Sequence, residues 1–295
     1  MTTEGERKAL TPGQDKLLDV AATIHTEAPA GEDMAFTHAV LCQVGLPRAR
    51  VEGQQFLRQS GSAWLSVQAG FLDEGSGPVQ QPIPYGVMPR LALAWVSTHA
   101  VRHRTREIPI GHSAAEFLRM MGMDRQGARY TTLRTQMHAL AACRLQLGFK
   151  GRTYNGQPVQ QFDAWITNRD TQQRALWPGL MVLSESYHDS LMDSAVPLDN
   201  RALQALKGSS LTLDIYTWLA HRLHRIEGRG VMLHWTSVRE QFAQEYNGKQ
   251  ADKDFKKKFL PALHKVQAVY PKADVKQVTG GLLLLPSPPP ISPKG

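Results

Sequence analysis

Two segments of this 295-residue chain carry the same pattern at the same spacing, and this repeat restricts the possible folds more than any other feature of the sequence. Each copy has a tryptophan-bearing apolar segment that ends in His and Arg, then a short β-type run, then a longer amphipathic stretch. Trp95 and Leu140 are 45 residues apart in the first copy, and so are Trp218 and Leu263 in the second. A period of this length is typical of repeated supersecondary units. The alternative is a coincidence between two ordinary α+β segments.

The two copies also share their order of predicted elements. Short strands are predicted at 106–111 and 230–235, and each is followed by a Ser with a Glu three residues later, the capping box that begins a helix. These pairs are Ser113 with Glu116 and Ser237 with Glu240. A Gly-containing turn then leads to a longer helix, and a hairpin follows. The hairpin turns are predicted at Asn155-Gly156 and Gly280-Gly281.

Helix, strand, helix, turn, helix, hairpin is the order of a winged helix-turn-helix domain. We therefore predict an α+β fold that consists of two tandem winged helix-turn-helix domains with an N-terminal extension. The Gly- and Pro-rich stretch 73–86 interrupts regular structure and marks a boundary near residue 85. The predicted parts are a flexible N-terminal tail (1–35) with one short helix, an extension that packs on the first domain (36–85), the first winged-helix domain (86–185), and the second with a Pro-rich C-terminal tail (186–295).

Charge is distributed unevenly along the chain. The whole chain has a formal net charge of +8, whereas residues 1–85 hold six Lys and Arg against ten Asp and Glu, which leaves +12 on residues 86–295. A basic domain behind an acidic segment indicates a polyanionic partner. No apolar run approaches the roughly 18 residues that a membrane span needs. The two cysteines fit no metal or disulfide framework, and the first residues carry no secretion signal, so we expect a cytoplasmic protein with reduced thiols.

The long helix of the second copy has an apolar and a basic stripe. At about 100° per residue, its apolar side chains fall on one face and its lysines on another. The apolar stripe is Phe255, Phe259, Ala262, Leu263 and Val266, and the basic stripe is Lys249, Lys253, Lys256 and Lys257. Lysines at the N-terminal end of a helix oppose the helix dipole, a cost that bound phosphates would offset. The alternative is a face that lies against water.

The long helix of the first copy repeats this arrangement with other side chains. Its inner stripe is Leu133, Met137, Leu140 and Ala141, and its outer stripe is Thr131, Arg134, Thr135 and His138. Arg, Thr and His can contact base edges, whereas Lys more often contacts phosphate. Basic residues that enter the following hairpin are placed to flank a DNA backbone. The predicted DNA-binding residues are Arg129, Thr131, Arg134, Thr135, His138, Lys150, Arg152, Lys249, Lys253, Lys256 and Lys257.

The sequence lacks the motifs of the common nucleic-acid enzymes. It contains no phosphate-binding loop of the G-x-x-x-x-G-K-[ST] type and no His-apolar-His pair of a nicking enzyme. Two histidines at 221 and 224 have no acidic third ligand nearby, and no catalytic triad or carboxylate pair is evident. We therefore predict a binding protein without catalytic residues, metal or cofactor.

Three stretches resemble the plasmid-encoded RepA-type replication initiators: 36–48, 84–122 and 133–140. The resemblance extends over roughly residues 36–285, although the second copy matches in its order of elements more than in its letters. One departure is the single Gly at the start of the 127–143 helix, where more are expected.

The resemblance implies an initiator that binds repeats at a plasmid origin and recruits host DnaA and the replicative helicase. It also implies a possible homodimer that represses its own promoter. A plain winged-helix transcriptional repressor and a recombinase or nickase are the alternatives.

Overall fold

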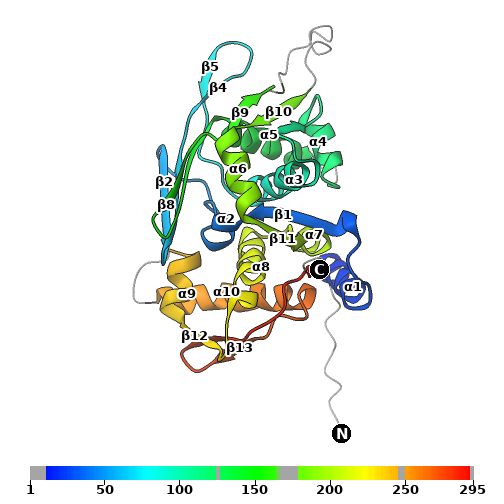
Figure 1. Ribbon diagram of the computed structural model, residues 1–295, viewed down its shortest axis with the longest axis vertical. Coiled ribbons are helices and arrows are strands. Elements are labelled where there is room, and N and C mark those ends of the chain that lie inside the picture. The colour runs from blue at the N-terminus through cyan, green and yellow to red at the C-terminus, as the bar shows by residue number, and fades with distance from the viewer. Residues whose placement is uncertain (1–10, 124–126, 164, 166–178, 245–249, 293–295) are drawn as a thin grey trace.

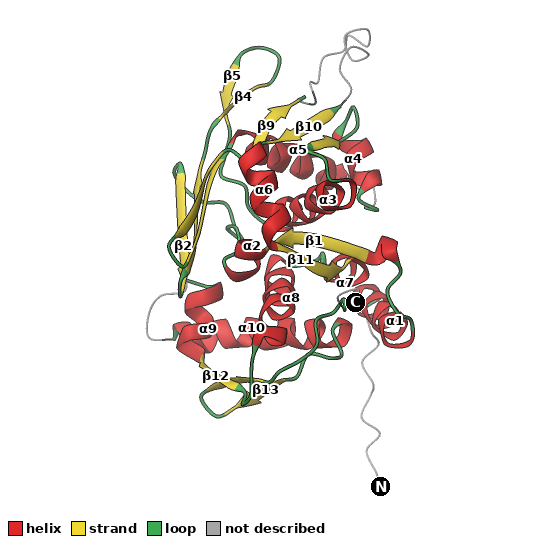
Figure 2. Ribbon diagram, in the orientation of Figure 1, coloured by secondary structure: helices red, strands yellow, loops and turns green. Residues whose placement is uncertain are grey.

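The computed structural model describes residues 11–123, 127–163, 165, 179–244 and 250–292 as a mixture of helices and small antiparallel sheets (Figures 1 and 2). Its buried apolar residues form one connected core that includes side chains from both copies of the repeat. Among the described residues, no helix is both long enough and apolar enough to cross a membrane.

The first copy has the predicted order of elements. They are α3 (Val87–His103), β6 (Glu107–Pro109), α4 (Ala114–Met120), α5 (Gly127–Ala142), β9 (Val159–Phe162) and β10 (Leu180–Leu183). The three strands form an antiparallel sheet in the order β6–β10–β9. The strand that follows the first helix therefore pairs with the last strand of the hairpin.

The second copy has the same order of elements and the same sheet. Its elements are α8 (Ser210–Arg222), the 3₁₀ turn η3 (Leu223–Arg225), β12 (Val231–His234), α9 (Trp235–Phe242), α10 (Ala251–Val269), β13 (Val275–Val278) and β14 (Gly281–Leu284). The strand order β12–β14–β13 corresponds to β6–β10–β9. The repeated element order that the 45-residue spacing indicates is thus present.

The predicted hairpin turn of the first copy is wrong. Asn155 and Gly156 lie within β8 (Arg152–Gly156), which pairs with β7 (Arg144–Phe149) through a two-residue loop at Lys150-Gly151. Both loop residues have positive φ (47° and 83°), as a type I′ hairpin requires. The β7–β8 hairpin is an insertion before the β9–β10 hairpin, because its strands pair with a sheet from the N-terminal part of the chain instead of with β6.

That N-terminal sheet has four strands in the order β2–β3–β7–β8, with β2 at Gln55–Ser60 and β3 at Ala63–Gln68. After β3 the chain continues into β4 (Phe71–Asp73), which forms a separate hairpin with β5 (Pro78–Gln80). The short helix α2 (Ala39–Gln43) packs between β3 and α8. The expected extension therefore shares a sheet with residues of the first copy.

A two-stranded ribbon lies between the two copies (Figure 1). It pairs β1 (Met34–His38) with β11 (Ala195–Asp199), and β11 is flanked by α6 (Glu185–Ser194) and α7 (Asn200–Leu206). A buried ion pair also joins the copies: Arg90 of α3 donates to both carboxylate oxygens of Asp214 of α8, at 2.6 and 2.8 Å. A strand of the expected extension thus pairs with a strand of the expected second domain.

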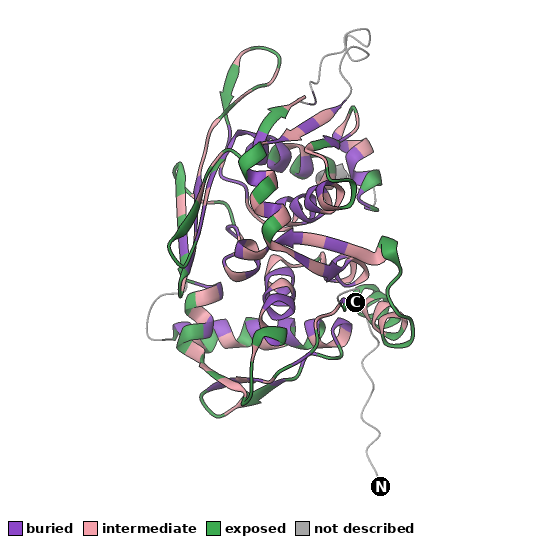
Figure 3. Ribbon diagram, viewed as in Figure 1, coloured by how far each residue is buried: buried purple, intermediate pink, exposed green. Residues whose placement is uncertain are grey.

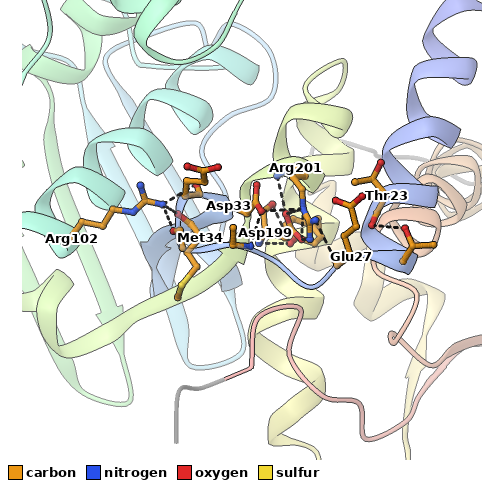
Figure 4. Close-up of polar contacts among 12 residues, drawn as sticks. Thr23, Glu27, Asp33, Met34, Arg102, Asp199 and Arg201 are labelled. Atoms are coloured by element: carbon orange, nitrogen blue, oxygen red, sulfur yellow. Dashed lines mark hydrogen bonds and ion pairs between the residues drawn. The ribbon is translucent and has the colours of Figure 1, made fainter.

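The N-terminal segment carries a docked helix, which differs from the expected flexible tail. Helix α1 (Pro12–Thr26) is exposed or half-buried along its length (Figure 3), and its apolar side chains Leu17, Ala21 and Ile24 pack on the core beside α7 and α10. The connection to β1 includes the 3₁₀ turn η1 (Gly31–Asp33) and is held by two arginines (Figure 4).

These two arginines come from different helices. Arg102 of α3 donates to the carbonyls of Gly31 and Glu32 at 2.8 and 3.0 Å. Arg201 of α7 donates to Asp199 at 2.7 Å and to the carbonyl of Glu27 at 3.3 Å. The segment between α1 and β1 is therefore attached to both α3 and α7.

Candidate nucleic-acid interface

Helix α5 offers only its N-terminal half to solvent. Every residue from 136 to 142 is buried, because α3, α4, β4 and β9 surround this part of the helix. Thr131 and Thr135 are exposed, Arg129 is half-buried, and the Arg134 side chain is 25% exposed. The N-terminal half of α5 is therefore the part that can reach a ligand.

The inner stripe of α5 is confirmed, since Leu133, Met137, Leu140 and Ala141 are all buried. The exposed position expected for His138 is wrong. This residue is only 2% exposed, its Nδ1 lies 3.1 Å from Oε1 of Glu74, and its ring meets Phe162 of β9 edge-on. Burial lowers the pKa of His138, so the imidazole is neutral at pH 7. Helical periodicity leaves this face free, whereas the β4–β5 hairpin and β9 cover it.

Glu74 joins three side chains at the edge of α5. Its Oε1 accepts hydrogen bonds from His138 and from Gln81 (2.8 Å), and its Oε2 lies 3.8 Å from Nη2 of Arg134. The hydrogen bond from His138 lowers the pKa of Glu74, which keeps the carboxylate ionised. Glu74 is not among the residues predicted from the sequence, because it lies in the Gly-rich turn of a hairpin 60 residues before Arg134 and no local pattern connects the two.

Helix α10 has the expected apolar stripe. Phe255, Phe259, Ala262, Leu263 and Val266 are all buried against α8 and α9. The acidic residues Asp252 and Asp254 lie in its first turn, where they favour the positive end of the helix dipole. They offset part of the cost of placing lysines there.

The predicted lysines of α10 have different surroundings. Lys253 is exposed, and Lys257 is exposed with its ammonium 3.9 Å from Asp254. Lys256 is half-buried and places its ammonium 5.1 Å above the Trp235 ring of α9. Lys249 lies outside the described residues. Lys253 and Lys257 are thus exposed to solvent, and Lys256 is oriented by an aromatic ring.

A basic groove runs along the flank of α10. It has a volume of about 650 Å³, lies between α10 and the start of α8, and has no acidic residue in its lining. Its basic side chains are Arg48, Lys257, Lys258 and Lys265. Of these four, only Lys257 is predicted from the sequence, although the positions of Lys258 and Lys265 on one flank of the helix could have indicated them.

Lys150 and Arg152 are exposed, but they lie at the tip of the β7–β8 insertion. Arg152 is 88% exposed and lies 3.7 Å from Asp193 of α6. The hairpin that pairs with β6 is β9–β10, and most of its connecting segment (166–178) lies outside the described residues. The structure therefore brings together four of the predicted residues on α5: Arg129, Thr131, Arg134 and Thr135. It places Lys150 and Arg152 apart from them, on the hairpin of the β2–β3–β7–β8 sheet.

In the described part of the chain, no cluster of three or more His, Cys, Asp or Glu could hold a metal ion. Cys42 and Cys143 are buried free thiols, and burial raises the pKa of Cys143 to about 12. A thiol with so high a pKa is a poor nucleophile.

These features define a basic protein of mixed helix and sheet with two copies of one helix–sheet unit. Residues 83–236, more than half of the chain, match the family model described as "Plasmid encoded RepA protein". The chain belongs to this family of RepA-type replication initiators, as the resemblance of its sequence implies.

The fold is similar to a crystal structure of domains 2 and 3 of RctB, with a TM-score of 0.51 and 12% identity; the match covers 84% of this chain and 98% of that one. A second crystal structure of RctB domains 2–3 matches with a TM-score of 0.49 and 12% identity, covering 83% and 94% of the two chains. At 12% identity, the first of these matches shows a similar fold and nothing about function. The sequence matches no curated protein.

Proposed function

We propose that this protein binds double-stranded DNA sequence-specifically and initiates plasmid replication from repeated sites at the plasmid origin. In this proposal each copy of the repeat is a winged helix-turn-helix unit, with α5 and α10 as recognition helices and β9–β10 and β13–β14 as wings. Membership of the RepA family and the identical strand orders of the two sheets support it. A recognition helix of this kind enters the major groove with its N-terminal residues against the bases.

The observation that carries the proposal is the exposure of α5. The accessible side chains among the described residues of α5 lie in its N-terminal half, which presents Thr131, Thr135 and part of Arg134, whereas residues 136–142 are buried. Arg and Thr are side chains that contact base edges. The lysines at the start of α10 are suited to phosphate, so the first unit would supply more of the specificity and the second more of the electrostatic attraction.

We propose further that the protein acts without catalysis of its own. The absence of a phosphate-binding loop from the sequence supports a division of labour in which the host supplies DnaA and the replicative helicase. Binding as a homodimer to the promoter of its own gene, with a role in copy control, belongs to the same proposal.

A winged-helix transcriptional repressor is the second candidate. The same recognition elements would serve it, but a repressor commonly needs one such unit per chain, and two different units in tandem favour a long asymmetric site. The charge distribution supports DNA as the partner in either case, since the net +12 falls on residues 86–295, which contain both units.

Footprinting on the intergenic DNA beside the gene tests the proposal. Protection of several direct repeats is expected of an initiator, whereas protection of one palindrome would assign the protein as a repressor. Incubation with supercoiled plasmid checks the absence of catalysis, because nicks or covalent protein–DNA adducts would reveal a nickase or recombinase. No preference for intergenic over random DNA of equal length would contradict both binding functions.

A further inference from the structure

The β4–β5 hairpin brings an acidic residue to the edge of the exposed half of α5. Glu74 lies in its turn, and it reaches the helix from a part of the chain that precedes the whole first copy of the repeat. Between Arg58 and Arg90 the sequence has no Lys or Arg, whereas the hairpin carries Asp73 and Glu74. A hairpin with this charge is unsuited to contact phosphate itself. A favourable effect of the hairpin on DNA recognition would therefore have to pass through the residue it touches.

The carboxylate of Glu74 is anchored from the buried side. Its Oε1 is held by His138, which is 2% exposed, and by the side-chain amide of Gln81. Its Oε2 remains for Arg134 at 3.8 Å. Only His138 is fully buried in this group, whereas the Glu74 and Arg134 side chains are 28% and 25% exposed. The guanidinium of Arg134 therefore lies beside the Glu74 carboxylate, which His138 and Gln81 hold in place.

An arginine that contacts a base must hold its planar guanidinium in one orientation. An unrestrained arginine side chain loses conformational entropy when it adopts that orientation. A fixed carboxylate beside it reduces that loss, because the guanidinium is already oriented before DNA binds. A negative charge near DNA also weakens attraction to phosphate equally for all sequences. The first effect raises the ratio of specific to non-specific affinity, and the second weakens binding to all DNA without changing that ratio.

We propose that Glu74 is a positioning residue for DNA recognition: supported by His138 and Gln81, it orients Arg134 for base contact and limits non-specific binding. This inference rests on the proposed function. It assigns to His138 a supporting role behind the interface, in place of the base contact that the sequence pattern predicts.

The Glu74→Gln variant tests the proposal, because Gln has the same shape. Its Oε1 can still accept from His138 and Gln81, while an amide group replaces the oxygen that faces Arg134. Binding is measured on a duplex that carries the footprinted site and on a random duplex of equal length. We expect the ratio of the two affinities to fall about 5- to 50-fold, with unchanged or stronger binding to random DNA.

Asp73→Asn is the matched control. It removes the same charge from the same hairpin, and Asn can keep the hydrogen bonds that Asp73 accepts from the backbone N–H groups of Gly75 and Gly77. We expect stronger binding to random DNA but an affinity ratio within about twofold of the wild type, since no hydrogen bond or ion pair joins the Asp73 side chain to α5 among the described residues. An equal fall in the ratio for both variants would overturn the proposal, because it would then reflect charge alone.

A double variant separates positioning from a general structural effect. In an Arg134→Ala background, Glu74→Gln should lower the ratio no further, whereas damage to the hairpin would lower it again and contradict the inference. An unchanged ratio for Glu74→Gln alone would do the same. If the wild type shows no preference for the footprinted site, the proposed function fails, and this inference fails with it.

Discussion

The buried ion pair between Arg90 and Asp214 permits a direct test of how the two copies are held together. Both side chains are nearly buried, at 9% and 10% exposure. The Arg90 guanidinium also donates to three backbone carbonyls, those of Leu46, Pro47 and Gly86, at 2.6, 3.0 and 2.7 Å. All its donor directions are thus used, and Asp214 supplies the countercharge. An Asp214→Asn variant would retain the shape of the side chain but leave the guanidinium buried without that charge.

We expect Asp214→Asn to lower the free energy of unfolding by about 3–5 kcal/mol, the usual effect of removing one partner from a buried pair. Arg90→Leu should cost more, because it also removes the donor from three carbonyls, each worth about 1–3 kcal/mol when left unsatisfied. The double variant should show a coupling energy of about 2 kcal/mol or more between the two positions. Urea unfolding followed by tryptophan fluorescence and circular dichroism measures all three values.

Arg152→Ala provides the control, because it breaks the exposed pair with Asp193 and should change the free energy of unfolding by less than about 0.5 kcal/mol. A loss below about 0.5 kcal/mol for Asp214→Asn would refute the reasoning, since the pair would then behave as a surface ion pair. Two separate unfolding transitions in the wild type would also contradict it, because a pair that joins the copies within one core should make them unfold together.

The other predictions concern recognition and acid sensitivity. Arg134→Ala should weaken binding to the footprinted site by ~1–3 kcal/mol and relax preference at one or two base pairs; unchanged affinity and preference would show that α5 does not read bases there. Neutralising Lys253, Lys256 and Lys257 together should reduce the slope of log affinity against log salt by ~2–3 units on specific and random DNA alike, and an unchanged slope would mean that these lysines face water. Burial lowers the pKa of His38 from 6.5 to about 4, so the unfolded chain binds the proton more readily, and about 3 kcal/mol of stability should be lost as the pH falls through that interval. His38→Gln should remove this part of the pH dependence, as unfolding measured at pH 7, 5 and 4 would show.

The successful predictions concern patterns that are encoded within one element. The apolar stripes of α5 and α10 follow from helical periodicity, and each predicted apolar position is buried. The cap at Ser113 is also confirmed, since its hydroxyl accepts from the backbone N–H of Glu116 at 3.2 Å. At the corresponding place in the second copy, α9 already begins at Trp235, so Ser237 lies inside the helix. The strand β12 runs directly into α9 there, and no linker remains for a Ser cap.

The failed predictions depend on segments that are distant in the sequence. His138 is buried because a hairpin from residues 71–80 covers a face that helical periodicity leaves free. Asn155-Gly156 would form a good turn in isolation, but β3 recruits β7 into its sheet, and the resulting register places the loop at Lys150-Gly151. The N-terminal segment contains too few apolar residues to predict a docking site, and only the surfaces of α7 and α10 supply one. Local periodicity predicts which face of a helix is apolar, but not what covers the other faces.

The β1–β11 ribbon has a consequence for the way the protein is made. Met34 pairs with Asp199, so β1 emerges from the ribosome long before its partner strand exists. At about 5–20 residues per second, the interval is roughly ten to thirty seconds, during which β1 has an unpaired edge. Helix α1 reaches its final packing later still, because its neighbour α10 ends only at Val269. Helix α1 and β1 are therefore synthesised before the elements they pack on, and a chain that ends before β11 holds neither the ribbon nor the docked helix.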